Sequence, residues 1–217
     1  CYMSKLNYKY VAVEGNIGAG KTTLAKFLSS NLNGALLLEE FEDNQFLKAF
    51  YMGEDFAIHS ELQFILDRSR QLADFFSSKH SLVFSDYVPQ KSLIFSKINL
   101  TKTQFNVVSN LSQILYRPFE SPDLIIFIER EVDELIENIL KRGRVFEREI
   151  DETYIQSIME GYERWLKQLQ QPVLRIKANQ IDMTRPKQLI NSFQTILSEK
   201  YIQSEVKINL NQLMKVN

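Results

Sequence analysis

The feature that most constrains the fold is a glycine-rich segment between an apolar run and a helix-forming stretch. Residues 15–22 read Gly-Asn-Ile-Gly-Ala-Gly-Lys-Thr, which fits the pattern G-x-x-x-x-G-K-[ST] in full. The β-prone residues 10–13 come before this segment, and residues 22–31 follow with their apolar side chains at helical spacing. A strand, a glycine turn and a helix in this order predict a phosphate-binding loop.

The residue types of this loop suit the binding of a nucleoside triphosphate. Glycines allow backbone N–H groups to curl around phosphate oxygens, and the following helix directs the positive end of its dipole at the same anion. We expect Lys21 to reach the β- and γ-phosphates and the Thr22 hydroxyl to ligate Mg²⁺. ATPases, GTPases, kinases and motors share such a loop, so other residues must decide among them. The residues expected to bind ATP are Gly15, Asn16, Gly18, Ala19, Gly20, Lys21, Thr22 and Thr23.

Short apolar runs alternate with amphipathic stretches along the whole chain, which predicts an α/β fold. Strands of four to six apolar residues separated by helices indicate a parallel sheet that is covered on both faces. We expect a P-loop NTPase-type sheet of five parallel strands in a single domain over residues 1–217, with a peripheral tail from residue 201 that is either an edge helix or frayed. The expected strands are 10–13, 35–38, 82–84, 124–128 and 173–176. The expected helices are 22–31, 59–75, 103–116, 132–140, 154–169 and one that begins at Pro186.

Composition excludes several classes of protein. The chain has 26 Lys and Arg against 27 Asp and Glu, whereas a protein that binds polymeric nucleic acid usually has a basic excess. No apolar run approaches the ~18 residues of a membrane-spanning helix, so no membrane partner is expected. The one cysteine, Cys1, cannot form an internal disulfide, and no apolar leader opens the chain. We therefore expect a cytoplasmic protein.

An acidic segment after the second expected strand suits a phosphoryl acceptor. In an open parallel sheet, ligands bind at the carboxyl ends of the strands, where Glu39 could accept the proton of an attacking hydroxyl. Four carboxylates at Glu39, Glu40, Glu42 and Asp43 would repel an acceptor that already carries a phosphate, which favours a neutral hydroxyl. The alternative is a solvated acidic loop in which Asp43 and Asn44 cap a helix.

Two further segments fit phosphoryl transfer. Asp86 ends the third expected strand, which is the usual place of a second carboxylate that organises Mg²⁺, although it could simply cap the strand end. Residues 141–148 contain four cations, and mobile arginines that close over phosphates stabilise their charge and exclude water. We expect a lid at about residues 141–149; a plain basic surface patch is the alternative.

Together these segments resemble the deoxynucleoside kinase family, in particular its bacterial deoxyadenosine/deoxyguanosine kinase branch. The resemblance covers roughly residues 10–169 and rests on EGNIGAGKTT, EEFEDNQFLKAFY, SDYVPQKSLIF and KRGRVFE, in this order. It implies that Glu39 is the general base for the 5′-hydroxyl and that Asp86 lies near the metal. It also implies further substrate and lid residues, which are Tyr51 and Glu147 for the sugar 3′-hydroxyl, Phe56 for the nucleoside pocket, and Arg142 and Arg144 for the lid.

Two positions depart from the family pattern. His59 stands where the family commonly has a glutamine that reads the base edge, which leaves the base preference open. Tyr87 follows Asp86 where many members have an arginine, and Lys91 is a candidate replacement for that cation. The resemblance further places the adenine-binding loop of the donor at residues 179–182.

The activity expected from the sequence is transfer of the γ-phosphoryl group of ATP to a deoxynucleoside, with purines favoured. Lys21, Glu39, Arg142 and Arg144 are the expected catalytic residues, and Mg²⁺ is the expected cofactor. The resemblance also implies a homodimer that packs through helices 59–75 and 103–116. Two alternatives stay open, a nucleotide kinase similar to thymidylate kinase and a non-catalytic ATP-binding regulator.

Overall fold

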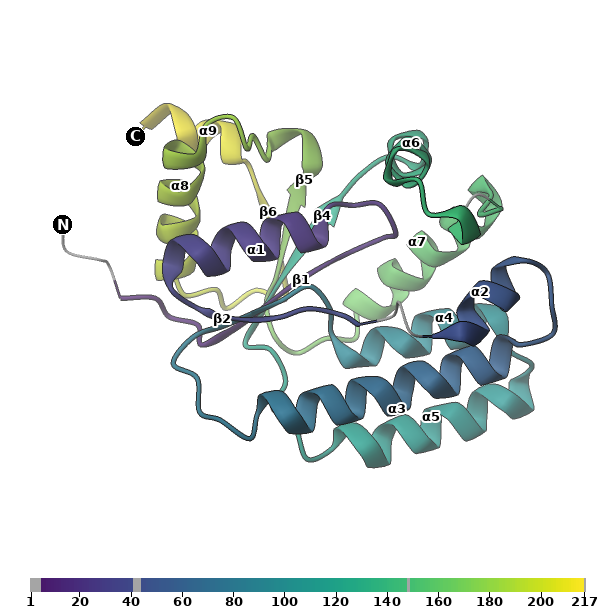
Figure 1. The fold of residues 1–217 in the computed structure, drawn as a ribbon. Coiled ribbons are helices and arrows are strands. Elements are labelled where there is room, and N and C mark those ends of the chain that lie inside the picture. Colours follow the sequence, from purple (N-terminus) through teal and green to yellow (C-terminus); the bar gives the residue numbers. More distant parts are fainter. Residues whose placement is uncertain (1–4, 41–43, 148, 217) are drawn as a thin grey trace.

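The core of the molecule is a sheet of six parallel strands in the order β2-β3-β1-β4-β5-β6 (Figure 1). The computed structural model describes residues 5–40, 44–147 and 149–216. The strands are β1 (Tyr10–Gly15), β2 (Ala35–Leu37), β3 (Val83–Ser85), β4 (Leu124–Glu129), β5 (Val173–Lys177) and β6 (Glu205–Ile208). The expected α/β architecture with a parallel sheet is therefore confirmed.

Helices connect the strands and cover both faces of the sheet (Figure 1). The α-helices are α1 (Lys21–Leu32), α2 (Gln45–Tyr51), α3 (Ala57–Phe75), α4 (Ser92–Asn99), α5 (Lys102–Tyr116), α6 (Val132–Arg142), α7 (Glu152–Leu166), α8 (Pro186–Ser198) and α9 (Leu210–Val216). Three short 3-10 helices are η1 (Pro89–Lys91), η2 (Val145–Glu147) and η3 (Ala178–Gln180).

The expectation of five strands is wrong, because the tail contributes a sixth. β6 pairs in parallel with β5, with Leu174 beside Val206 and Ile176 beside Ile208. It is an edge strand in which Glu205 and Lys207 alternate with the two apolar residues, so it lacks the continuous apolar run of a strand buried on both faces. The tail also forms α9, whose first residue, Leu210, is fully buried.

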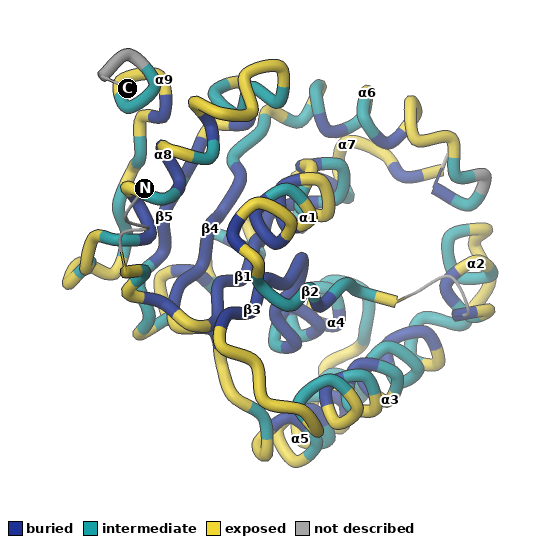
Figure 2. Tube along the Cα trace, turned by 60° about the vertical axis from the view of Figure 1, so that its left-hand side comes forward, coloured by how far each residue is buried: buried dark blue, intermediate teal, exposed yellow. Residues whose placement is uncertain are grey.

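Three buried apolar clusters hold the layers together. On one face of the sheet, Val11 of β1 and Ile126 of β4 belong to a cluster with residues of α1 and α8. Ala12 and Phe127 face the opposite way and pack with α4 and α7. Tyr10, which shares the face of Ala12 because strand side chains alternate, packs with α3 and α5. Figure 2 shows the buried strands in the middle and exposed residues along the outer sides of α3 and α5.

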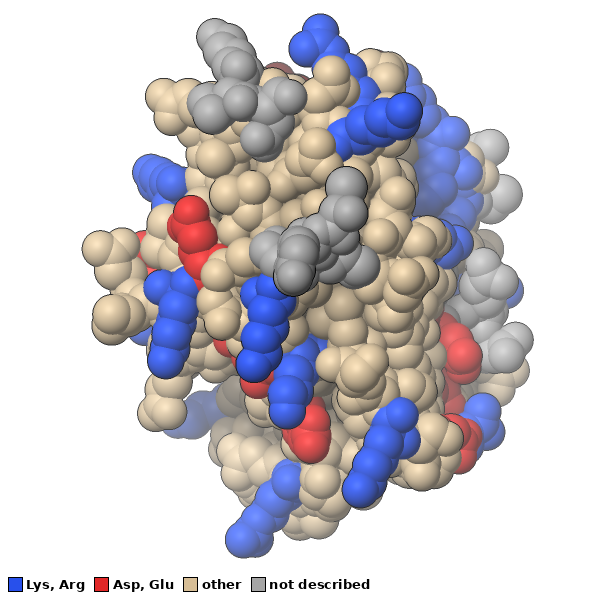
Figure 3. All heavy atoms as spheres, turned by 90° about the vertical axis from the view of Figure 1, so that its left-hand side faces the viewer, with Lys and Arg blue, Asp and Glu red and all other residues tan. Residues whose placement is uncertain are grey.

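The surface away from the carboxyl ends of β1 and β2 has no concentrated charge in the view of Figure 3. On this face, Lys, Arg, Asp and Glu side chains are scattered among uncharged residues (Figure 3). In the described ranges, no helix is long and apolar enough to cross a bilayer.

The parallel topology fixes where functional side chains meet. Ser85 lies between Leu37 of β2 and Ala12 of β1 in the strand register. The residues that leave the carboxyl ends of these three strands therefore gather at one edge of the sheet, as ligand-binding residues do in open α/β sheets. Glu39, Asp86 and the phosphate loop lie there.

Candidate active site

The glycine-rich loop joins β1 to α1 in a conformation that its glycines permit. Gly18 has φ of 81° and Gly20, the N-cap of α1, has φ of 98°, both in the left-handed region. A Cβ on Gly18 would also lie 2.7 Å from the carbonyl oxygen of Leu135 in α6. Glycine is thus required at position 18 by the backbone and by its neighbour.

Side-chain amides fix the loop to the helices around it. Asn16 Nδ2 donates to the carbonyl oxygen of Ile155 at 2.9 Å, and Asn138 Nδ2 donates to that of Gly18 at 2.9 Å. Lys21 Nζ folds back onto the loop and donates to the carbonyl oxygens of Gly15 and Asn16 at 3.0 and 2.9 Å. The loop is therefore tied to α6, to α7 and to the Lys21 ammonium.

Thr22 and Asp86 form a pair of oxygen donors beside this lysine. Thr22 Oγ1 donates to Asp86 Oδ2 at 2.5 Å, and Asp86 Oδ1 accepts from the backbone N–H of Glu39 at 2.7 Å. Within the described part of the chain, no cluster of three or more His, Cys, Asp or Glu side chains could hold a metal. The pair nevertheless fits Mg²⁺, which prefers oxygen ligands and commonly takes only one or two from the protein beside phosphates and water.

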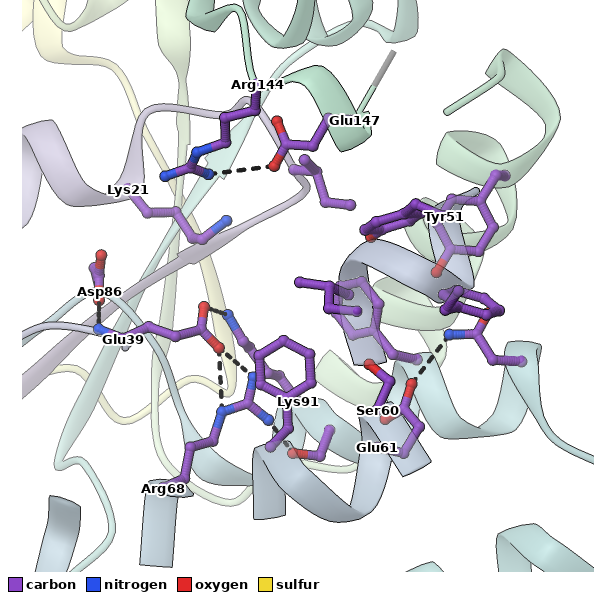
Figure 4. A pocket seen from close by; sticks show the side chains of 18 of the residues that line it. Lys21, Glu39, Tyr51, Ser60, Glu61, Arg68, Asp86, Lys91, Arg144 and Glu147 are labelled. Carbon is purple, nitrogen blue, oxygen red and sulfur yellow. Dashed lines mark hydrogen bonds and ion pairs between the residues drawn. The ribbon is translucent and has the colours of Figure 1, made fainter. Parts of the chain in front are cut away.

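The Glu39 carboxylate points into the site and is held by two cations. Lys91 Nζ lies 2.5 Å from Oε2, and Arg68 donates to Oε1 from Nε at 3.1 Å and from Nη2 (Figure 4). The Glu39 side chain is only 14% exposed, whereas Glu40 beside it is exposed. Lys91 is therefore one of two cations that form ion pairs with Glu39. Glu42 and Asp43 of the expected acidic cluster lie outside the described residues, and Asn44 caps α2 by accepting from Leu47 N–H at 3.0 Å.

The pKa values of Glu39 and Lys21 are both lowered in this crowded site, for different reasons. Burial disfavours the ionised form of Glu39, but Lys91 and Arg68 outweigh it and lower the pKa of the carboxyl to about 2. Burial and the neighbouring Lys91 lower the pKa of Lys21 to about 8, although Glu14, Glu39 and Asp86 oppose the change. At neutral pH Glu39 is therefore an ionised acceptor and Lys21 remains mostly protonated.

A cavity of about 910 Å³, its open mouth included, connects these groups to the lid and to α2, α3, α4 and α7. It is lined by Ile17, Lys21, Thr22, Glu39, Leu47, Phe50, Tyr51, Ser60, Glu61, Phe64, Arg68, Asp86, Lys91, Ser92, Phe95, Asn99, Arg142, Arg144, Glu147 and Tyr154 (Figure 4). The other expected loop residues, Gly15, Asn16, Gly18, Ala19, Gly20 and Thr23, are not among the described residues that line it.

The lid arginines line the cavity and are held there by Glu147. Arg142 donates to Glu147 Oε2 from Nε at 3.1 Å and from Nη2 at 2.5 Å, and Arg144 Nη1 donates to Oε1 at 3.2 Å. Glu147 is 6% exposed, and Phe146 beside it stacks on the Tyr51 ring at 6.3 Å between centroids. Arg148, the fourth cation of this segment, lies outside the described residues, as does Cys1.

Two expected substrate residues, Phe56 and His59, do not line the cavity in the described structure. The His59 ring packs on Phe46 and Phe56, with centroids 5.4 and 5.3 Å away, and the residue is exposed. His59 faces away from the cavity because of its position around the helix. Two residues along an α-helix turn the side-chain direction by roughly 200°, so His59 and Glu61 point to nearly opposite sides of α3. Glu61, two positions after His59, is the acidic residue of α3 that faces inward.

Sequence reasoning missed the polar residues on the inner face of α3. Ser60, Glu61 and Arg68 are buried on the same face as Ile65 and Leu72. The spacing 61, 65, 68, 72 is the helical period, so counting from the apolar pair would have found Glu61 and Arg68. Other cavity residues that the sequence did not suggest include Phe64, Phe95, Asn99 and Tyr154.

A second hollow lies at the carboxyl ends of β4 and β5. Asn179 of η3 lines it together with Asn16 of the glycine-rich loop and Arg130 after β4. The segment expected to contact the adenine of the donor therefore borders the phosphate loop.

Comparison with known proteins finds a family match over most of the chain. Residues 11–203 match the family described as deoxynucleoside kinase. The chain is 35% identical over 166 residues to a deoxyguanosine kinase of Bacillus subtilis (strain 168), which covers 75% of this chain and 80% of that protein. It is 25% identical over 198 residues to a deoxyadenosine/deoxycytidine kinase of the same organism, covering 87% and 90%.

The fold is similar to that of solved structures as well. A deoxyadenosine kinase from M. mycoides with bound dATP superposes with a TM-score of 0.74 at 24% identity, covering 87% of this chain and 98% of the other. At this identity the likeness describes the fold alone.

Proposed function

The chain belongs to the deoxynucleoside kinase family, and from this premise we propose that it transfers the γ-phosphoryl group of ATP to the 5′-hydroxyl of a purine deoxynucleoside. The observation that carries the proposal is that Glu39 lies in one cavity with Lys21, Thr22 and Asp86. A proton acceptor and a phosphate-binding loop thus face the same space. The purine preference is supported by the similarity to a deoxyguanosine kinase.

On the donor side, the loop amides and Lys21 would bind the β- and γ-phosphates of ATP. Thr22 and Asp86 would hold Mg²⁺, which supplies charge neutralisation of the phosphates when it is bound. Both side chains line the cavity, and they already share a hydrogen bond. These residues therefore have the charge and the oxygen donors that a magnesium-bound triphosphate requires.

On the acceptor side, Glu39 would orient the 5′-hydroxyl and take its proton. A carboxyl whose pKa is about 2 is a weak base, but phosphoryl transfer through a loose transition state needs little proton removal before the O–P bond forms. Lys91 and Arg68 restrict the carboxylate to one direction. We therefore infer that Glu39 acts mainly by positioning the hydroxyl and accepts its proton late.

Tyr51 and Glu147 would hold the sugar. Both line the cavity; Figure 4 shows Tyr51 on the side opposite Asp86 and Glu147 between Arg144 and Tyr51. A 3′-hydroxyl can donate to a carboxylate and accept from a phenol, so this pair can satisfy both of its hydrogen-bonding roles. Burial and the neighbouring Tyr154 and Glu147 raise the pKa of Tyr51, which keeps the phenol protonated as a donor.

Arg142 and Arg144 would stabilise the transferring phosphoryl group. Their guanidinium groups share one buried carboxylate, Glu147, so the sugar contact and the phosphate contact belong to the same short segment. Arginines that neutralise charge in the transition state of phosphoryl transfer raise its rate strongly. Sugar binding and lid position are therefore coupled through Glu147.

The assay that tests this proposal compares phosphorylation of the four deoxynucleosides with that of thymidine 5′-monophosphate, with ATP and Mg²⁺ present. We expect a purine deoxynucleoside to have the highest kcat/KM. A preference for the monophosphate would favour a nucleotide kinase instead, and absence of product with every acceptor would favour a non-catalytic ATP-binding regulator.

The proposal extends to a homodimer in the cytoplasm. The outward sides of α3 and α5, which lie side by side in Figures 1 and 2, present large exposed apolar residues, Leu66, Val107 and Ile114, at 53%, 56% and 70% exposure. Such residues are typical of a surface that packs on a second copy. Sedimentation at micromolar concentration tests this, and a single monomeric species would argue against it.

A further inference from the structure

Glu61 is a buried carboxylate in the cavity to which the transfer reaction assigns no role. It is 5% exposed and lies on the inner face of α3. Ser96 Oγ donates to Oε2 at 2.8 Å and Asn99 Nδ2 donates to Oε1 at 3.0 Å, both from α4. Figure 4 shows Glu61 beside Ser60, at the side of the cavity away from Lys21 and Asp86.

The contacts of Glu61 leave it with unused acceptor capacity. An ionised carboxylate has about four lone-pair positions, and the hydrogen bonds from Ser96 and Asn99 use two of them. Among the described residues, none forms an ion pair with Glu61, and Arg68 acts on it only at longer range. Burial raises the pKa of this carboxyl, and further hydrogen-bond donors from a ligand would stabilise its ionised form.

The nucleobase is the part of the substrate that would reach Glu61. With the 5′-hydroxyl at Glu39 and the 3′-hydroxyl at Tyr51 and Glu147, the base extends into the remaining part of the cavity. Phe64 and Phe95 line this part, and aromatic rings suit the flat face of a base. Glu61 is then available to the edge of the base.

The hydrogen-bonding groups of each nucleobase determine which one fits the two free acceptor positions of Glu61. The Watson–Crick edge of guanine has two adjacent donors, the N1–H and the 2-amino group. Adenine and cytosine each place one amino donor beside a ring-nitrogen acceptor, and thymine places a single N–H between two carbonyl oxygens. A carboxylate therefore matches guanine with two hydrogen bonds and leaves a repulsive contact with every other base.

We propose that Glu61 is the base-selecting residue and that it accepts the N1–H and the 2-amino N–H of guanine, so that deoxyguanosine is the preferred acceptor. This inference rests on the proposed kinase function and names the substrate of the same site. It also replaces His59, which the sequence suggested for this role, with a residue on the inner face of the same helix.

Two measurements test the inference, and the first needs no variant. kcat/KM is measured for deoxyguanosine, deoxyinosine, deoxyadenosine and deoxycytidine at saturating ATP and Mg²⁺. Deoxyinosine keeps the N1–H but lacks the 2-amino group, so we expect it to be about tenfold poorer than deoxyguanosine. Equal kcat/KM values for deoxyguanosine and deoxyinosine would overturn the bidentate contact.

The second measurement uses Glu61→Gln, in which one acceptor becomes an amide donor. The amide N–H would face an N–H of guanine, so two donors would meet. With adenine or cytosine the amide N–H can donate to the ring nitrogen and the amide oxygen can accept from the amino group. We expect the kcat/KM ratio of deoxyguanosine to deoxyadenosine to fall by at least about tenfold. Asp67→Asn is the matched control, because it is the same change on α3 at a residue that bonds Gln63 rather than the cavity.

The outcomes separate this inference from the proposed function. If Glu61→Gln retains activity and the wild-type ratio, the base assignment is wrong while the kinase assignment stands. If the wild-type protein phosphorylates no deoxynucleoside, the proposed function itself fails. If Glu61→Gln does not fold, the comparison of deoxyguanosine with deoxyinosine on the wild-type protein still decides.

Discussion

Replacement of Arg68 by methionine tests how the site holds its carboxylate. Arg68 is 4% exposed; it donates to Glu39 and Ser92 and stacks on Phe64, with its guanidinium carbon 4.7 Å from the ring centroid. Methionine keeps an unbranched apolar side chain in this space but removes the charge. Glu39 would then be left with Lys91 alone as its cation partner.

The magnitude follows from the pKa of Glu39. At about 1.4 kcal/mol per tenfold change in an equilibrium, a decrease of this pKa from 4.5 to about 2 is a net stabilisation of about 3 kcal/mol, which remains after the two cations have offset the cost of burying the carboxylate. Because the folded-state pKa is depressed, this stability is present above the unfolded-state value of 4.5 and is lost as the pH falls toward 2. Loss of one partner of a buried pair costs about 3–5 kcal/mol, and the remaining Lys91 reduces that cost. We therefore expect Arg68→Met to lose about 2–4 kcal/mol at pH 7.

Urea unfolding followed by circular dichroism measures this change in the free energy of unfolding. A thermal scan should show the Tm lowered by roughly 5–15 °C, given a domain of this size. Arg70→Met is the control, because Arg70 is exposed on the same helix and should change stability by less than about 0.5 kcal/mol. A loss below about 1 kcal/mol for Arg68→Met would refute the reasoning, because the pair would then contribute no more than a surface ion pair.

Three further predictions concern the loop, its lysine and the sugar contact. Gly18→Ala should destabilise the protein by about 1–3 kcal/mol in urea unfolding and raise the KM for ATP. The reason is that φ at this position is 81° and the new Cβ would meet the Leu135 carbonyl oxygen. An unchanged KM and an unchanged free energy of unfolding would contradict this. The kcat/KM for ATP should fall as the pH rises through about 8, where Lys21 loses its proton, and a flat profile to pH 10 would be inconsistent with that pKa. Wild-type protein should phosphorylate a 2′,3′-dideoxynucleoside about tenfold less efficiently than the 2′-deoxynucleoside, and Glu147→Gln should reduce this preference; equal preference in both proteins would exclude Glu147 from 3′-hydroxyl recognition.

The parts of the fold that the sequence predicted well are those with strong local signals. β4 is a run of apolar residues typical of a strand buried on both faces, and the glycine-rich loop has a fixed pattern between strand and helix. β6 was missed because half of its four residues are charged and its pairing with β5 is a contact across the sheet. Edge strands of this kind depend on tertiary pairing more than on local propensity.

The site could be predicted where residues follow strand ends, and much less where they lie on helices. Glu39 and Asp86 come directly after β2 and β3, so the topology of a parallel sheet alone places them together. His59 and Glu61 are two residues apart on α3, and only the phase of the helix decides which one faces the cavity. Comparison with the family motif assigned the cavity position to His59. Helical spacing from the buried residues Ile65 and Leu72 assigns it to Glu61 instead.

The central claim is that the carboxylate at position 39 positions the acceptor hydroxyl and takes up its proton. Single-turnover phosphorylation of deoxyguanosine by Glu39→Gln, with ATP affinity measured in parallel, tests it most directly. The account predicts that the rate of the chemical step falls by about 10²–10⁴ while the Kd for ATP changes little, since Lys21 and the loop remain intact. A chemical step near the wild-type rate would contradict the account.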